Sequence, residues 1–471
     1  MVAQTLPQDE FERSRFLLPL LASVVFMAVV SGTMINVGLP YIGRDFNVTE
    51  GTYGWIVTGY TLTFGIFSAI NGRLGDVFGI KNLYLVGILI FGFTSLAVSM
   101  SPSIEVAIAL RLFQGAGAAA MPVLGSTIIA KVYPAKSRGK AMGVIMSVVG
   151  VAASIGPFLG GILVQWFGWR SIFVCTALVL PAALVGLKIL PNRLNVRPKT
   201  HFDFVGATLL GVAIALTIYS FNILESNHGV TPSLLINIGV ALTLHVSFFI
   251  WIRFAHTPFV TTEVLANIRY LAVSLVAFVS NATRFGTIVL VPIFLTEVNH
   301  VAPAMIGAVL LPGAIAIALL STKAGALADR LGPRWPVTFG LTFIVLGNLI
   351  TAYFAGASLA GVGVGMGLYG MGFAMIQTPC VSAVSQIVPP DQVGVGTGMF
   401  MMIFFIGGAV GVAMSVTALE FQDASTLSWV GLQLGAGARF SNAILLLTGF
   451  ALLGFLLIPA LPSRASLDAA K

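Results

Sequence analysis

A charged turn with a fixed spacing of glycine, leucine and aspartate occurs twice in the sequence. The first copy, GRLGDVFGIK, covers residues 72–81, and the second, GALADRLGPR, covers residues 325–334. Asp76 and Asp329 hold the same place in the two copies, 253 residues apart. A carboxylate at a helix end can accept hydrogen bonds from backbone N–H groups or pair with a cation of a neighbouring helix. Because the turn is repeated, we expect such a contact and not two solvated loop carboxylates.

Two arginines lie inside apolar stretches. Arg111 is followed by Gln114 three residues later, and Arg284 is preceded by Asn281 three residues earlier. Residues three apart share a helix face, and a guanidinium at membrane depth should face the protein interior. We therefore predict a polar cavity, although a structural hydrogen-bond hub at Arg111 and a place near an interface for Arg284 are alternatives. The predicted cavity residues are Asn36, Arg111, Gln114, Asn281, Arg284 and Gln377.

The acidic residues are placed differently from the arginines. All 16 fall toward the ends of the apolar stretches, and none falls in a centre. Two embedded arginines without an embedded acid favour a neutral or anionic substrate over a cationic one. If protons are carried, the candidates are the acids near the ends, namely Asp76, Glu105, Glu225 and Glu297. No metal-ligand spacing, nucleophile elbow or phosphate loop occurs, so we expect no metal, no cofactor and no enzyme.

The elements that must position these residues are membrane-spanning helices. Hydrophobic residues make up 57% of the 471, and charged residues only 8%, against about 25% in soluble proteins. Fourteen apolar runs reach about the 20 residues that a spanning helix needs, and they are continuous, as in helices, and not alternating, as in barrels. These runs are 16–39, 52–71, 82–101, 104–128, 139–166, 169–190, 204–224, 232–254, 269–296, 304–323, 336–356, 359–386, 394–418 and 439–460.

Lys and Arg predict the orientation, because cytoplasmic loops carry an excess of them. With the N-terminus in the cytoplasm, nineteen of the 24 fall on the cytoplasmic side, three fall outside and two lie within spans. We therefore expect a multi-pass protein of the cell (inner) membrane with both termini in the cytoplasm. The same asymmetry accounts for the net charge of +8 without a nucleic-acid partner.

The distance between the two turns predicts the domain organisation. Six helices occupy about 190 residues, so a plain duplication would separate the turns by less than the observed 253. Two inserted helices account for the difference. We predict an all-α protein with a six-helix half at 1–190, a linker with two extra helices and a connector at 191–268, and a second six-helix half at 269–471.

Three motifs together resemble the major facilitator superfamily. They are the turn at 72–81, the stretch RLFQGAGAAAMPV at 111–123, and Gly143 with SIGPFLGG at 154–161. Val77, Ile80 and Ala152 depart from the usual residues of these motifs. The whole chain resembles most the fourteen-helix drug:proton antiporters, especially the fourteen-helix tetracycline exporters.

The resemblance implies an exporter that works by alternating access, with proton-coupled efflux of a small amphipathic drug-like compound. It implies a lipid bilayer as surroundings and a monomer as the working unit. Residues of the motifs would then gate the conformational change: Gly72, Asp76, Gly79, Lys81, Gly143, Gly156, Pro157, Gly160, Gly161, Asp329, Arg330 and Arg334.

Proton coupling does not carry over directly from the resemblance. Relatives carry acids in the first and thirteenth helices, where this chain has Ser31 and Gly32, and then Gly407 and Gly408. An uncoupled or differently coupled carrier of an anionic metabolite or lipid-like substrate is therefore an alternative. A receptor or enzyme embedded in the membrane is an alternative of another class.

Overall fold

The structure, a computed structural model, describes residues 8–133, 135–195, 203–226, 230–255, 262–388, 393–422 and 436–464. Within these ranges the secondary structure is helical, without a strand, as predicted. The α-helices are α1 (Gln8–Phe46), α2 (Glu50–Phe78), α3 (Ile80–Ser99), α4 (Ile104–Val132), α5 (Ala135–Phe167), α6 (Arg170–Ala177), α7 (Leu180–Ile189), α8 (Phe204–Ser226), α9 (Pro232–Phe254), α10 (Thr262–Ala266), α11 (Ile268–Glu297), α12 (Pro303–Leu331), α13 (Arg334–Phe354), α14 (Leu359–Ile387), α15 (Val393–Glu420) and α16 (Ala436–Leu457). Short 3₁₀ turns, η1 (Asn192–Asn195) and η2 (Ile458–Ala460), follow α7 and α16.

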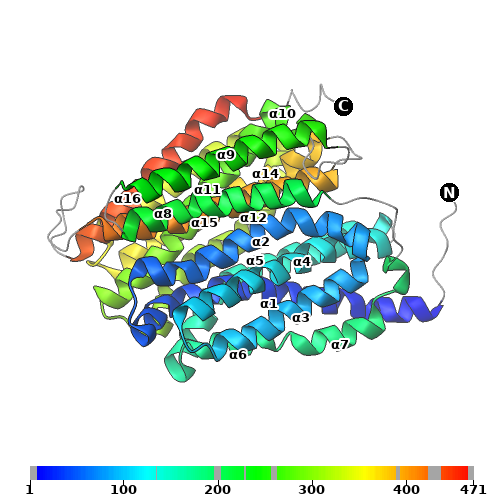
Figure 1. Cartoon of the computed structure of the whole chain (residues 1–471), viewed down its shortest axis with the longest axis horizontal. Helices are drawn as coiled ribbons and strands as arrows, with labels where there is room; N and C mark the ends of the chain where they lie inside the picture. The colour runs from blue at the N-terminus through cyan, green and yellow to red at the C-terminus, as the bar shows by residue number, and fades with distance from the viewer. Residues whose placement is uncertain are drawn as a thin grey trace.

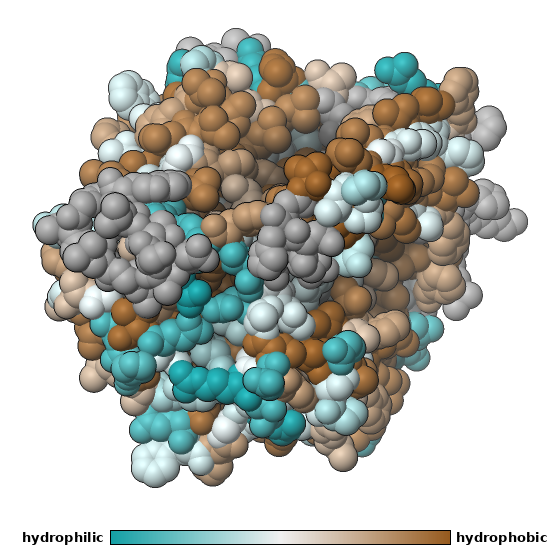
Figure 2. All heavy atoms as spheres, turned by 60° about the vertical axis from the view of Figure 1, so that its left-hand side comes forward, coloured by the Kyte–Doolittle hydropathy of each residue, from teal (hydrophilic) through white to brown (hydrophobic). Residues whose placement is uncertain are grey.

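The molecular surface is apolar along its flanks. Large side chains such as Phe93, Trp166 and Leu456 are more than half exposed, and many others resemble them. Figure 2 shows apolar residues over much of the surface, above all in the upper and right-hand parts of the view, while polar residues gather at its lower left. A soluble protein rarely exposes so much contiguous apolar surface, whereas a bilayer solvates it.

Twelve helical segments of the described chain are long and apolar enough to span a membrane. The sequence predicted fourteen spans, so the predicted number is not confirmed. The two predicted runs outside the twelve, 52–71 and 139–166, lie in α2 and α5, and α5 contributes only the shorter apolar stretch Ile155–Phe167. One of the twelve, Arg170–Ile189, is made of α6 and α7 together, with Pro181 at the start of α7, where a missing N–H is tolerated.

The helices form two bundles that lie side by side (Figure 1). Helices α1 to α7 make one bundle and α11 to α16 the other, while α8 and α9 pack on each other beside α15. We call the end where α1 meets α2 the Glu50 end, and the end where α2 meets α3 the Lys81 end. The described parts of the chain begin and finish toward the Lys81 end, on the right of Figure 1.

The bundles meet along two long seams, α2 against α15 and α5 against α12, and α1 also contacts α11. Glycines allow the close approach, because a side chain would collide with the opposite helix. A Cβ atom on Gly65 of α2 would lie 2.9 Å from Cβ of Phe405 on α15, and one on Gly307 of α12 would lie 2.7 Å from Cα of Phe158 on α5. Both seams thus bring backbone against backbone across the two bundles.

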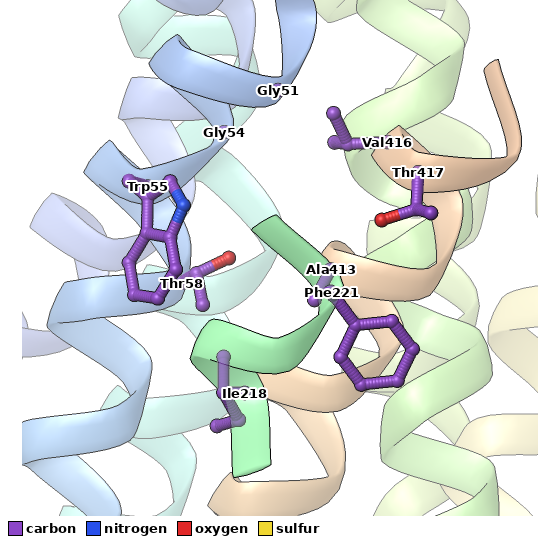
Figure 3. A pocket seen from close by; sticks show the side chains of 9 residues that line it. All are labelled: Gly51, Gly54, Trp55, Thr58, Ile218, Phe221, Ala413, Val416 and Thr417. Atoms are coloured by element: carbon purple, nitrogen blue, oxygen red, sulfur yellow. The ribbon is translucent and has the colours of Figure 1, made fainter. Parts of the chain in front are cut away.

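Helix α8 covers the α2–α15 seam from outside. Tyr219 of α8 lies against Trp55 of α2, with ring centroids 6.3 Å apart, and α8 also contacts α15. The three helices enclose a small, mainly apolar pocket near the Glu50 end (Figure 3). Its lining residues are Gly51, Gly54, Trp55, Thr58, Ile218, Phe221, Ala413, Val416 and Thr417.

Candidate functional site

The repeated turn has the same backbone conformation in both copies. Gly79 joins α2 to α3 with φ of 87°, and Gly332 joins α12 to α13 with φ of 80°. This left-handed region favours glycine, because a Cβ atom would clash with the backbone. The side chains of Asp76 and Asp329 lie outside the described part of the structure, so their predicted contacts stay predictions.

Lys81, the basic residue of the first turn, is buried. Its ammonium group donates to the carbonyl oxygens of Leu187 at 3.0 Å and Leu190 at 2.7 Å, and to Oδ1 of Asn192 at 2.8 Å. A cation at the C-terminus of a helix satisfies free carbonyls and stabilises the helix dipole. These contacts attach α3 to the end of α7 within the first bundle.

The other predicted gating residues fall into two groups. Arg330 is exposed at the end of α12, and Arg334 begins α13. Gly72 and Gly143 lie in α2 and α5 at positions whose surroundings the structure does not describe.

Small residues let α5 approach two other helices closely. A Cβ atom on Gly156 would collide with Oγ1 of Thr33, and one on Gly160 with the carbonyl oxygen of Met34, both on α1. On another face, a Cβ atom on Gly161 would collide with the carbonyl oxygen of Pro303 at the start of α12. Helix α5, which also contains Pro157, therefore packs tightly against a helix of each bundle.

Arg111 lies fully buried inside the first bundle. Its Nε donates to the carbonyl oxygen of Ile56 at 2.9 Å, and its Nη1 donates to Oε1 of Gln114 at 2.6 Å. The guanidinium carbon lies 4.0 Å from the ring centroid of Tyr60. Gln114 in turn donates to Oγ of Ser95 at 2.5 Å, so the chain of bonds joins α2, α4 and α3. This geometry favours the structural-hub alternative for Arg111.

Arg284 has a different environment at the centre of α11. Its guanidinium carbon lies 4.5 Å from the ring centroid of Phe373 and 5.5 Å from that of Phe285. The side chain stays partly accessible, while the residues next to it on α11 are buried. One turn earlier, Asn281 donates to the carbonyl oxygen of Phe404 at 2.8 Å, and its Oδ1 is buried without a partner among the described residues. Arg284 and Asn281 thus present unused polar groups on one face.

The remaining predicted cavity and proton-carrying residues belong to four different helices. Asn36 is fully buried on α1, and neither of its amide atoms has a partner among the described residues, while Gln377 is partly accessible on α14. Glu105 is exposed at the start of α4. The side chain of Glu225 lies outside the described part.

An ion cluster that the sequence analysis did not predict lies at the Glu50 end. Nη2 of Arg439 lies 2.8 Å from Oε2 of Glu297 and 3.2 Å from Oε1 of Glu50. Arg439 and Glu297 belong to the second bundle, but Glu50 begins α2 of the first. The Glu50–Arg439 pair therefore crosses between the bundles. No local spacing could have predicted it, because its members are 389 and 142 residues apart.

The chemistry available to these groups is that of charge contacts and hydrogen bonds. Within the described residues, no group of three or more His, Cys, Asp or Glu side chains is arranged to hold a metal ion. Cys175 and Cys380 are free thiols.

Comparison with known proteins gives consistent results. The sequence matches the Major Facilitator Superfamily over residues 21–412. It is 31% identical to the multidrug resistance protein Stp of Mycobacterium tuberculosis (strain CDC 1551 / Oshkosh) over 86% of this chain and 75% of that protein. It is 27% identical to the riboflavin transporter RibZ of Clostridioides difficile (strain 630) over 83% and 84%. Among solved structures, a bacterial homologue of the human lysosomal transporter Spinster, inward-facing and unoccupied, superposes with a TM-score of 0.68 at 16% identity, over 98% of each chain.

Proposed function

The chain belongs to the Major Facilitator Superfamily, and we propose that it exports small amphipathic organic compounds by alternating access. Its family makes it a multi-pass membrane transporter and not an enzyme. The observation that carries the proposal is the pair of glycine-lined seams between two helical bundles. Arg284 lies in the second bundle beside Phe373. Close contacts that can separate at either end let two rigid bundles rock about a central site.

We assign fourteen spans to this transporter by adding α2 and α5 to the twelve apolar segments. Helix α2 has 29 residues and α5 has 33, which is long enough to cross about 30 Å of hydrocarbon. Both lie between protein helices, α2 against α4 and α15 and α5 against α1 and α12. A helix shielded from lipid in this way needs fewer apolar residues than one that faces lipid.

The Glu50 end faces the outside in this proposal, and both termini lie in the cytoplasm of a cell (inner) membrane. The excess of Lys and Arg in the loops of the Lys81 end supports the orientation. Two contacts at the Glu50 end join the bundles. One is the Glu50–Arg439 pair, and the other is a hydrogen bond of 3.2 Å from the Ala304 amide of α12 to Oε1 of Gln165 on α5. In this arrangement the outer end is closed.

We assign proton coupling to the cluster at the outer end. Of the predicted candidates, Glu297 belongs to it, but its pair with Arg439 lies within one bundle. Glu50 makes the contact that crosses the seam, so a proton on Glu50 removes an attraction that holds the outer end closed. Glu297 then serves to hold Arg439 in place. Among the described residues, Tyr53, Glu420 and Arg44 also lie near this cluster.

Transport by the purified monomer in proteoliposomes tests the proposed function. An imposed pH gradient should drive movement of amphipathic compounds, measured with a panel of cationic, neutral and anionic compounds. Collapse of the gradient by a protonophore is the control, and protein-free liposomes give the leak. Failure to move any compound above that leak contradicts export. Movement that does not depend on the gradient contradicts coupling only.

A further inference from the structure

Arg284 is a charged group for which the described residues supply no countercharge. None of the 16 acids falls in the centre of a predicted span. Among the described residues, Arg284 makes no ion pair and no hydrogen bond of ordinary geometry. An uncompensated guanidinium at membrane depth is unfavourable. The described residues therefore leave this cation without a compensating anion.

The surroundings of Arg284 differ from those of the other embedded arginine. Arg111 donates to a carbonyl and an amide and has no exposed surface. Arg284 instead lies over the rings of Phe373 and Phe285 and keeps accessible surface. The rings stabilise the cation only weakly, by about 0.5–2 kcal/mol each. The donors of this guanidinium thus remain available to a ligand that can reach them.

Two side chains with unused polar atoms lie near Phe285, one of the two rings beside this arginine. Oδ1 of Asn281, on the same face of α11, is an acceptor without a partner among the described residues. Oγ1 of Thr61, on α2 of the other bundle, is equally unpartnered there. Both side chains approach Gly408 of α15: a Cβ atom there would lie 3.0 Å from Nδ2 of Asn281 and 3.1 Å from Cγ2 of Thr61. Cδ2 of Phe285 also lies 3.0 Å from that point, so Asn281, Thr61 and Phe285 share one locality on the seam, and Arg284 lies over the Phe285 ring.

We propose that this locality binds the anionic group of an amphipathic organic acid that also carries a hydrogen-bond donor. Arg284 pairs with the carboxylate or a similar anion, since a guanidinium offers two parallel N–H donors to it. Asn281 Oδ1 accepts from a hydroxyl or amine next to that anion. Phe285 and Phe373 contact the apolar body, and Thr61 adds a contact from the first bundle. This inference rests on the proposed export function and names its substrate class.

Binding of four matched probes to the full-length protein in nanodiscs tests the proposal. The probes are naphthylacetate, its primary amide, a naphthylmethyl-trimethylammonium cation, and naphthylglycolate, which adds a hydroxyl beside the carboxylate. Wild-type protein should bind naphthylacetate more tightly than the amide or the cation, and naphthylglycolate more tightly still. Arg284→Gln should weaken naphthylacetate binding by roughly 30-fold or more, because a desolvated charge pair is lost. It should affect the amide far less.

Three further variants separate the site from general damage to the protein. Arg284→Lys keeps the charge and should retain most of the preference for the acid over the amide. Asn281→Ala should remove the preference for naphthylglycolate over naphthylacetate and leave the preference for acid over amide. Arg170→Gln makes the same chemical change at a residue that pairs with Asp45 at the Glu50 end, so it should leave all four affinities unchanged.

The outcomes distinguish this inference from the proposed export function. Wild-type protein that binds the amide as tightly as the acid overturns the anion site, and so does an equal loss for all probes in Arg284→Gln. Tight, Arg284-dependent binding of the acid without transport of it or of any other compound in proteoliposomes supports the site and overturns export. Transport of the cation with no response to any Arg284 variant supports export and overturns the anion site.

Discussion

The Glu50–Arg439 pair should control how often the Glu50 end is open. Its N–O distance is 3.2 Å, and the two side chains are 18% and 23% exposed. Exposed ion pairs contribute about 0.2–1 kcal/mol, and hydrogen bonds to charged groups about 1.5–3 kcal/mol, so we assign about 1–2 kcal/mol to this partly buried pair. Because 1.4 kcal/mol is about tenfold, Glu50→Gln should raise the ratio of open to closed molecules by roughly 5- to 30-fold.

Distance measurement between two spin labels across the seam is the assay. Thr49 of the first bundle and Ala302 of the second are exposed at the Glu50 end and can carry the labels after Cys175 and Cys380 are replaced. All variants are measured in nanodiscs at one and the same pH. Glu50→Gln should enlarge the long-distance population relative to the unmutated residue.

Glu297→Gln is the matched control for this prediction. It makes the same chemical change and removes a contact to the same guanidinium, at 2.8 Å, but one that lies within the second bundle. It should therefore leave the distance distribution close to that of the wild type. An unchanged distribution in Glu50→Gln, or an equal shift in both variants, would refute the assignment of the closing contact to Glu50.

Three further predictions test the remaining assignments. Asp76→Asn should nearly abolish transport at normal expression. Asp329→Asn should reduce transport less, because the first bundle holds the fuller set of motifs. Wild-type export rates in the Asp76→Asn variant would contradict a gating role for Asp76. Gly156→Leu should trap one conformation, since even a Cβ atom at this position meets Thr33 of α1. Gly239→Leu is the control and should not trap a conformation, because a Cβ atom there would meet nothing within 4 Å. The test is cysteine labelling at both ends of the protein, and equal labelling in the two variants counts against gating by α5. Arg111→Gln should lower the melting temperature, because it leaves buried hydrogen-bond partners unsatisfied at a cost of about 1–3 kcal/mol for each orphaned group. It should not change the preference for binding the acid over the amide. A changed preference at normal stability would place Arg111 in the substrate site.

Local patterns predicted the helices and the repeated turn. Hydropathy over about 20 residues reports the contact of a helix with lipid, and the two turns could be aligned because glycine is required at Gly79 and Gly332 alike. By the same hydropathy measure, α2 is not among the twelve spans of the described chain. Helix α2 faces protein on several sides, so threonine, tyrosine and glycine replace the larger apolar residues that lipid would demand.

The contacts between distant helices could not be predicted in the same way. Sequence spacing placed Gln114 beside Arg111, and the structure has their hydrogen bond. It could not show that Ile56 and Tyr60 of another helix also contact Arg111, which decides how much of its charge a ligand could reach. The Arg439 cluster depends entirely on such distant contacts, because each of its members lies at the end of a different helix.

The burial of α11 has a consequence for how the protein is made. An arginine at the centre of an inserting helix opposes insertion by about 2.5–3.5 kcal/mol, and α11 carries Arg284 and Asn281 near its middle. Most of its residues contact protein in the finished structure, yet α15, one of its main partners, is synthesised later. We expect α11 to remain beside the insertion machinery until α15 arrives. A larger residue at Gly411 of α15, which meets the Ala282 backbone of α11, would therefore first reduce the amount of protein that reaches the membrane.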